Sequence, residues 1–248
     1  MTTTIDEIAP DIFRISAFAS ELGFSFNQYL VRDEQPLLYH TGFRKAFPAT
    51  RDTVARLLDP ATIRWIGYSH FEPDECGALN EWLAIAPNAS PITGIVGSSV
   101  VLEDFADRPA RVLQDGEILP TGKRSFRFLA TPHLPHGWDA SLLFEETTHT
   151  LFCSDLFMHS GSGPAIVETD IVEPAREMMA ASLDSPFAHS LPWTPHTEIM
   201  FERLAGLEPQ VLAVMHGSAY RGDGSKALLD LCGVAGELAS ASHRADIS

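Results

Sequence analysis

The chain has 248 residues, an apolar fraction of 45% and a formal net charge of −16. This length suffices for one large α/β domain with a sizeable core, and the charge, with Lys and Arg scattered along the chain, disfavours binding to nucleic acid. No run approaches the roughly 18 apolar residues of a membrane span, and the N-terminus has no basic and apolar signal segment, so we expect a cytoplasmic protein without membrane contact.

Short alternating runs near the N-terminus predict antiparallel strands, with a turn at Asp33–Pro36. These runs are residues 12–15, 24–31 and 36–40. Thr50 is a favourable N-cap for a short helix that should end before Pro60. A buried strand is expected at Ile63–Tyr68, and helical spacing follows at Gly77–Leu83.

The second half of the chain alternates between apolar runs and turns. Strand character is expected across residues 91–119 and in residues 125–129, 140–145, 150–153 and 211–215, with helices from Thr194 through Leu204 and from about Ser225 to Leu238. Residues 156–195 contain pattern-breaking Gly and Pro and are expected to form an excursion, or lid. No long linker divides the chain, so residues 1–248 are predicted to form a single domain.

Six His, Asp and Glu side chains lie at or just past the ends of predicted strands. They are His70, Glu72, Asp74, His136, Asp155 and His216. In an extended segment alternate side chains face the same way, so the first three can converge while Phe71 and Pro73 point away, toward core or backbone. Three imidazoles and three carboxylates suffice for two divalent ions, and Asp155, midway in sequence order, is expected to bridge them.

The types of ligand favour a redox-active metal. Mixed nitrogen and oxygen ligands suit iron or manganese, with zinc as an alternative, and three carboxylates stabilise higher oxidation states. The three cysteines, Cys76, Cys153 and Cys232, are widely spaced without a Cys-x-x-Cys pattern, so they predict reduced core thiols rather than a thiolate site.

Four more residues are assigned around these ligands. Glu75 directly follows Asp74 and is a candidate extra ligand, and His133 competes with His136 or lies beside the site. Trp138 is expected either to wall the pocket or to lie in the core, and His40 is expected to play a structural role.

The motif His70-x-Glu72-x-Asp74-Glu75, with its downstream partners, resembles the metallo-β-lactamase superfamily over most of the chain. This resemblance implies an α/β fold, the metallo-β-lactamase αββα sandwich, in which two packed mixed β-sheets are flanked by helices. Superfamily hydrolases typically show His-x-His-x-Asp-His. Glutamate at the second position instead looks like the flavodiiron proteins and the stand-alone oxygen-binding diiron proteins.

The flavodiiron resemblance implies two iron ions and a role for each ligand. His70, Glu72 and His136 would hold one iron, Asp74 and His216 the other, and Asp155 would bridge them. The interval to Asp155 favours His136 over His133 in this comparison. Glu75 stands where the family commonly has histidine, which leaves the ligands of the second iron open.

Two functions of different classes follow from the resemblance. The first is a non-haem diiron protein that binds dioxygen or nitric oxide as a sensor or a partner-dependent reductase. No FMN domain and no rubredoxin cysteines are found in this sequence, so an oxidoreductase would need a separate electron-donor protein, and a homodimer is compatible with this reading. The alternative is a dinuclear hydrolase of an ester, thioester or lactone, against which Glu72 counts because it reduces Lewis acidity.

Overall fold

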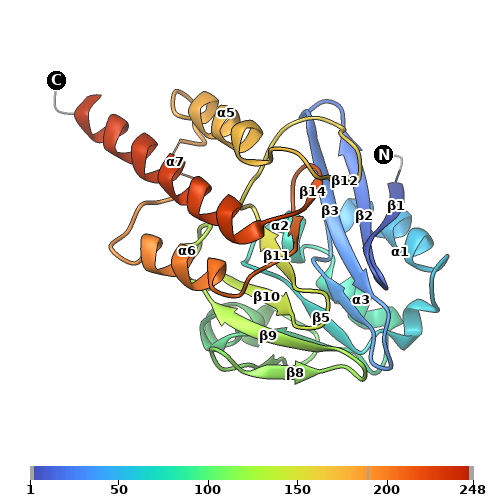
Figure 1. Ribbon diagram of the computed structural model, residues 1–248. Helices are drawn as coiled ribbons and strands as arrows, with labels where there is room; N and C mark the ends of the chain where they lie inside the picture. The colour runs from blue at the N-terminus through green and yellow to red at the C-terminus, as the bar shows by residue number, and fades with distance from the viewer. Residues whose placement is uncertain (1–2, 189, 246–248) are drawn as a thin grey trace.

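Two seven-stranded β-sheets lie face to face, with helices covering their outer faces (Figure 1). The computed structural model describes residues 3–188 and 190–245, with side chains described through residue 240. The expected sandwich of two mixed sheets flanked by helices is confirmed.

The first sheet is formed by the N-terminal half of the chain. Its strands, in spatial order, are β1 (Thr3–Ala9), β2 (Ile12–Ala19), β3 (Phe24–Val31), β4 (Leu37–Tyr39), β5 (Trp65–Gly67), β6 (Ser90–Thr93) and β7 (Arg111–Val112). Neighbours are antiparallel from β1 to β4 and parallel from β4 to β7. The parallel strands therefore direct their C-terminal ends to one edge, where loops can carry functional side chains.

The second sheet is formed by the C-terminal half. Its spatial order is β12 (Ile166–Val167), β14 (Ala219–Arg221), β13 (Val211–Val214), β11 (Thr150–Ser154), β10 (Ser141–Glu145), β9 (Ser125–Ala130) and β8 (Ile118–Pro120). Within it, β11 and β13 are parallel, so the residues that follow them emerge side by side.

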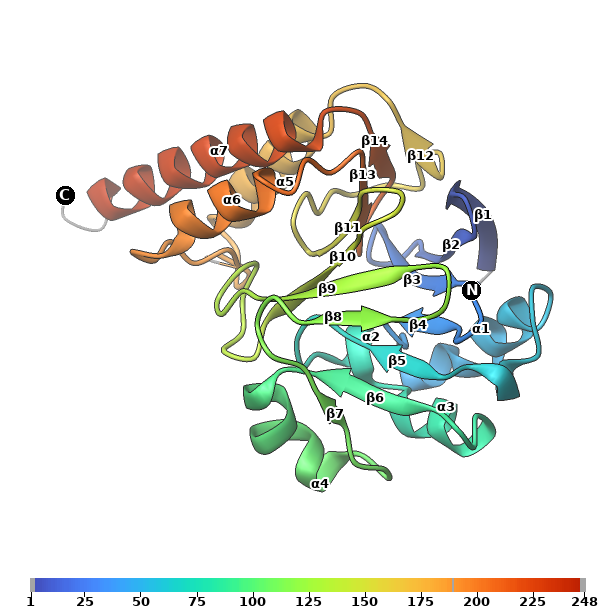
Figure 2. The ribbon, with the colours of Figure 1, turned by 60° about the horizontal axis from the view of Figure 1, so that its bottom comes forward.

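Helices cover both outer faces, as Figure 2 shows for α3 and α4 below the first sheet and for α5, α6 and α7 above the second. The helices are α1 (Phe47–Val54), α2 (Pro73–Cys76), α3 (Leu79–Ile85), α4 (Glu103–Phe105), α5 (Val172–Ser182), α6 (Thr197–Ala205) and α7 (Gly224–Ala245). Among the described residues, no helix combines the length and apolar character needed to cross a membrane.

Alternation along the strands divides the apolar side chains among separate cores. In β3, Tyr29 lies between the sheets, whereas Leu30 packs with the helices of the first sheet. In β10, Leu143 lies between the sheets, whereas Leu142 and Phe144 pack with α5, α6 and α7. Strands buried on both faces explain why their sequences are apolar almost throughout.

Two predictions about helix starts are wrong. The helix predicted to be capped by Thr50 begins at Phe47, because Pro48 suits the first turn, where a missing N–H is no loss. Thr50 lies inside α1 and donates from its hydroxyl to the carbonyl of Ala46 at 3.3 Å. Likewise α6 begins at Thr197 rather than at Thr194.

The strand character expected across residues 91–119 is only partly correct. β6 ends at Thr93, and a π-helical turn at Gly97–Leu102 leads into α4. Burial of Leu102 in the core beneath the first sheet favours the helical conformation over the β preference of the neighbouring valines.

Candidate metal centre

The segment from the loop after β5 to the first turn of α2 supplies His70 and most of the acidic side chains of the site. Glu72 is extended, with φ −134° and ψ 157°, and α2 begins at Pro73, whose fixed φ suits a first helical turn. The extended conformation predicted through Asp74 is therefore wrong. Asp74 and Glu75 project from the first turn of a helix, and Phe71 is 45% exposed instead of lying in the core.

Three loops of the second sheet supply the other side chains. His136 lies between β9 and β10, Asp155 directly follows β11, and His216 comes two residues after the end of β13. Ser154 has a positive φ of 54°, a left-handed conformation that turns the chain as it leaves β11. Since β11 and β13 are parallel, Asp155 and His216 meet at one edge of the sheet.

Asp155 lies between two groups of side chains and presents one oxygen to each. Its Oδ2 is 3.5 Å from His70 Nε2 and 3.4 Å from His136 Nε2. Its Oδ1 is 3.2 Å from His216 Nε2. The first group is completed by Glu72, whose Oε1 is 3.2 Å from His136 Nε2, and the second by Asp74.

All six residues predicted as ligands thus converge on one place. Their candidate ligand atoms form groups in which every atom lies within 4.8 Å of the others: His70, Glu72 and His136; His70, Glu75 and Asp155; and Asp74, Glu75 and His216. His70 Nε2 and both carboxylate oxygens of Glu75 are buried without a hydrogen-bond partner among the described residues. Buried nitrogen and oxygen atoms that lack a hydrogen-bond partner are suitable metal ligands, so they fit a centre that binds cations.

Side chains of the first sheet hold the loop that carries His216. Asn27 donates to the carbonyls of Val214 and Gly217, at 2.9 Å in each case, and Arg14 donates to Gly217 at 2.8 Å. His216 Nδ1 lies 3.0 Å from the carbonyl of Ser25, so this nitrogen can donate while Nε2 faces Asp155. Polar residues inside an otherwise apolar strand are the sequence signal from which this support could have been predicted.

His70 is held by a buried polar chain on the side away from Asp155. The Ser69 hydroxyl lies 3.0 Å from His70 Nδ1 and 2.7 Å from the Ser154 hydroxyl. His40 Nε2 contacts the same Ser69 hydroxyl at 3.1 Å, which agrees with the structural role expected for His40. Burial lowers the pKa of His40 to about 3, so its imidazole is neutral at pH 7.

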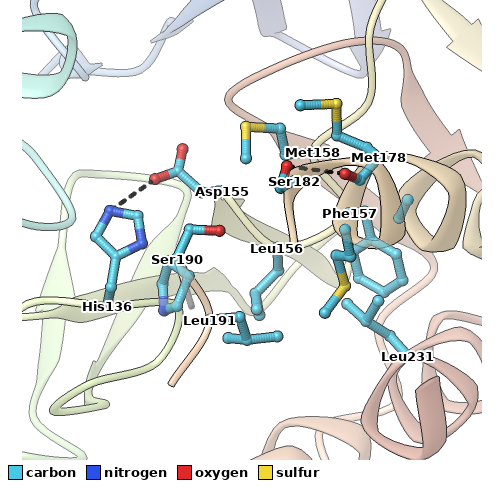
Figure 3. Close-up of a pocket in the computed structure, with 13 residues that line it drawn as sticks. His136, Asp155, Leu156, Phe157, Met158, Met178, Ser182, Ser190, Leu191 and Leu231 are labelled. Carbon is cyan, nitrogen blue, oxygen red and sulfur yellow. Dashed lines mark hydrogen bonds and ion pairs between the residues drawn. The ribbon is translucent and has the colours of Figure 1, made fainter. Parts of the chain in front are cut away.

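A small apolar cavity opens beside Asp155 and His136 (Figure 3). Its volume is about 30 Å³, and its lining includes Leu156, Phe157, Met158, Met178 and Leu231. The space exceeds that needed for a single water, and most of its lining residues are apolar, so it suits a small apolar molecule.

A larger, more open cleft reaches the same side chains. Its volume is about 600 Å³, and Phe24, Phe26 and Phe187 contribute apolar surface to it. Glu72, His136, Asp155 and His216 also line this cleft. The centre is therefore accessible from outside, and the segment between α5 and α6 forms part of the entrance.

Comparisons with known proteins agree with this geometry. The model of a family described as "ODP family beta lactamase" matches residues 24–217, which is more than half of the chain. The chain belongs to the ODP family.

This ODP-family chain is also similar to longer proteins. It is 30% identical over 182 residues to the putative diflavin flavoprotein A 3 of Nostoc sp., covering 70% of this chain and 31% of that protein. It is 27% identical over 211 residues to the rubredoxin-oxygen oxidoreductase of Megalodesulfovibrio gigas, covering 82% of this chain and 51% of the relative. The chain spans between about a third and a half of the length of these relatives.

Solved structures show the same fold. The rubredoxin oxygen:oxidoreductase of Desulfovibrio gigas superposes with a TM-score of 0.80 at 23% identity, covering 93% of this chain and 61% of that one. A fragment, residues 1–254, of the putative diflavin flavoprotein A 5 of Nostoc sp. superposes with a TM-score of 0.78 at 16% identity, covering 99% and 98%.

Opposite charges balance one another around Asp155 in this ODP-family chain. Burial raises the pKa of Asp155, but the hydrogen bond from His216 and the imidazoles of His70 and His136 outweigh burial, so the pKa lies below its usual range. Burial lowers the pKa of His136 and of His216, yet their carboxylate partners raise both values above the ordinary one. In the absence of metal, protons on these imidazoles supply the positive charge that neutralises the carboxylates. A bound cation would supply this charge instead, so metal binding should release the protons.

The acidic side chains of α2 behave differently. Burial is the main cause that raises the pKa of Glu75 well above its usual range, and the carboxylates of Asp155 and Asp74 raise it further. Burial also raises the pKa of Asp74. Negative charge on this side of the site is therefore only partly compensated by protein groups.

Two residues assigned to the surroundings lie away from these groups. His133 has a positive φ of 66° and an exposed side chain, and it is absent from the groups of candidate ligand atoms among the described residues. Trp138 is 62% exposed and lines neither the small cavity nor the larger cleft. Of the two histidines in the loop between β9 and β10, His136 points into the centre and His133 is exposed to solvent.

Proposed function

We propose that this ODP-family chain holds two iron ions and binds dioxygen or nitric oxide, as a sensor or as a reductase that depends on an electron-donor partner. The observation that carries this proposal is the position of Asp155, with one oxygen toward each of two His and carboxylate groups. One relative is named a rubredoxin-oxygen oxidoreductase and another a diflavin flavoprotein, and both names support redox chemistry of this class.

The residues divide between the two ions as follows. His70, Glu72 and His136 would hold one ion, Asp74 and His216 the other, and Asp155 both. Two iron ions, when bound, would supply electrons to a small diatomic ligand. His70 and His216 would be oriented by the hydrogen bonds at Nδ1, and the mostly apolar cavity beside His136 would admit a gas.

The first test is metal content followed by exposure to air. Protein purified without oxygen from iron-supplied cells should contain two iron ions per chain, and air should produce a new absorption band. Asp155→Ala should lose both ions, with a loss of affinity beyond the roughly 10- to 100-fold typical of an outer partner. Asp52→Ala, which removes an exposed carboxylate on α1, is the matched control and should retain both. Protein that binds only zinc and is unchanged by air would contradict the proposal.

The size of the larger cleft favours a second candidate function. A volume of about 600 Å³ is typical of sites for organic molecules and far exceeds the space a diatomic ligand needs. A dinuclear hydrolase of an ester, thioester or lactone would use this cleft to hold its substrate. Hydrolysis of a panel of such substrates, abolished by Asp155→Ala, would establish this function in place of the first.

The electron donor, the assembly and the location of the protein are proposals as well. We expect a separate electron-donor protein, a homodimer and a cytoplasmic location. We expect no binding to nucleic acid or to a membrane. Copurification of a reduced flavin or iron–sulfur protein that accelerates the reaction with oxygen would identify the donor.

A further inference from the structure

Glu75 is a fully buried carboxyl side chain that lies among other candidate ligands. Its side chain is 0% exposed, and neither Oε1 nor Oε2 accepts a hydrogen bond from the described part of the chain. Charged groups in protein interiors are normally paired or bound to metal, because an unpaired charge loses its hydration without compensation. The state of Glu75 therefore requires an explanation that the protein groups alone do not provide.

Glu145 provides a direct comparison within the same chain. It is also 0% exposed, but its carboxylate accepts hydrogen bonds from the backbone N–H groups of Thr147 (3.0 Å) and Thr148 (2.7 Å) and pairs with Arg124 at 3.2 Å. Glu145, a buried glutamate with a structural role, is therefore fully paired. Glu75 differs in accepting no hydrogen bond from an N–H group, and its neighbours are candidate ligands themselves, namely His70 Nε2 at 3.8 Å and the carboxyl group of Asp74.

The position of Glu75 is fixed by its backbone. Its carbonyl accepts hydrogen bonds from the N–H of Thr41 at 2.6 Å and from the Thr41 hydroxyl at 3.2 Å, and its N–H donates to the carbonyl of Glu72 at 3.2 Å. These contacts fix the first turn of α2 against the loop after β4. The side chain is consequently held facing the centre.

Glu75 reaches both halves of that centre. Its Oε1 is 3.8 Å from His70 Nε2, which belongs to the first half. Its ligand atoms also fall within 4.8 Å of those of Asp74 and His216, which belong to the second half. Among the candidate ligands, Asp155 is the other carboxylate that lies in contact with both halves.

We propose that Glu75 is a seventh ligand that joins the two halves of the centre, as a second carboxylate beside Asp155. This inference rests on the proposed dinuclear site. Glu75, together with Glu72, Asp74 and Asp155, would bring the number of ligand carboxylates to four. Their four negative charges would balance the four positive charges of two divalent ions. The orphaned oxygens of Glu75 are then satisfied by metal, and the centre is neutral when both ions are divalent.

Substitution of Glu75 should have opposite effects on the metal-free and metal-loaded proteins. Glu75→Gln keeps the size of the side chain but removes its charge. Metal-free Glu75→Gln should unfold at a higher temperature than the metal-free wild type, because the amide removes the repulsion between this buried carboxyl group and the nearby carboxylates of Asp155 and Asp74. Elemental analysis after dialysis should show fewer than two ions per chain, with at least a tenfold weaker affinity for the ion that is lost.

Glu145→Gln is the matched control, since it alters an equally buried glutamate outside the centre. It should lower the unfolding temperature of both forms and leave two ions per chain. Glu75→His adds a second variant, whose imidazole can bind metal without carrying negative charge. It should recover more of the lost ion than Glu75→Gln does.

The outcomes separate this inference from the proposed function. If the wild type binds no stoichiometric metal, the proposed function fails, and this inference fails with it. If the wild type binds two ions and Glu75→Gln binds two with unchanged affinity, the dinuclear site stands and the role of Glu75 as a ligand is overturned. Equal metal content in Glu75→Gln and Glu75→His, both below two, would also count against ligation by this side chain.

Discussion

A single carboxylate, Asp33, ties the two sheets together at the end far from the centre. Its oxygens accept hydrogen bonds from the Thr121 hydroxyl at 2.8 Å and from the N–H groups of Lys123 and Arg124 at 3.1 and 2.9 Å. Burial raises the pKa of Asp33, but these hydrogen bonds outweigh burial and hold the pKa below its usual value. The turn after β3 is thereby fastened to the turn between β8 and β9.

Asp33→Ala should destabilise the protein most at neutral pH. Because hydrogen bonds to a charged group contribute about 1.5–3 kcal/mol and partial exposure weakens them, we expect a loss of about 1 kcal/mol at pH 7. The pKa of Asp33 is lower in the folded state, so its contribution is present above the unfolded value of about 3.9 and is lost as pH falls through the folded value. Urea unfolding of the variant and the wild type over a pH series would check this, and a difference that grows toward acidic pH would contradict it.

At the same scale, the sequence predicted the identities of the clustered residues but not their surroundings. His70, Glu72 and Asp155 were recognisable because imidazoles and carboxylates recur at strand ends with regular spacing. The burial of Glu75 was not predictable, because it depends on the helical turn that Pro73 starts. Neither was the contact of Ser69 with Ser154, since the two lie in different sheets.

Among the elements, α5 and α7 control the space beside the centre. Met178 on α5 and Leu231 on α7 line the small cavity next to Asp155 and His136 (Figure 3). Access to the centre for a small apolar molecule should therefore depend on how closely these helices pack. Neither residue offers a ligand atom of the kinds found in the centre, so the cavity can be altered without changing the ligands.

Met178→Trp should fill this cavity and slow the reaction of the reduced, iron-loaded protein with oxygen severalfold. Overpacking is expected to cost about 1–3 kcal/mol in stability, which leaves the fold intact. Stopped-flow absorbance measures the rate, and elemental analysis should show unchanged iron. Ile199→Trp on α6, at a position that is 61% exposed, is the control and should react at the wild-type rate. Equal rates in all three proteins would show that gas does not enter by this cavity.

The sequence predicted elements well where their periodicity is clear and poorly elsewhere. Residues 24–31, 150–153 and 211–215 were expected as strands and form β3, β11 and β13, because long alternating or apolar runs have few alternatives. The short edge strand β12 was missed, since two residues carry no periodic signal. The helical turn at Gly97–Leu102 was taken for β structure, because its packing depends on distant residues.

In the whole molecule, the centre lies between the two sheets and draws ligands from both. His70 and Glu72 come from the loop after β5 in the first sheet and Asp74 from the first turn of α2, whereas His136, Asp155 and His216 follow strands of the second sheet. Bound metal would therefore act as a cross-link between the sheets, and only the folded state brings the ligands together. Stability should depend strongly on metal occupancy.

Removal of metal should lower the unfolding temperature substantially. Two ions, each present at about 100 times its dissociation constant, contribute about 5 kcal/mol, which corresponds to about 10–20 °C for a chain of this size. Differential scanning calorimetry with and without a chelator would measure the shift, and restoring the metal should reverse it. A chelator that leaves the unfolding temperature unchanged would show that the sheets are held together without metal.

The division of the chain into two sheets also sets the order in which the centre can form. Residues 3–112 contain all the strands of the first sheet, and residues 118–221 contain all those of the second. On the ribosome the first sheet can fold early, but the half of the centre that uses His216 stays incomplete until that residue has emerged. A nascent chain shorter than this consequently cannot assemble both metal positions, and full loading must follow the folding of the second sheet.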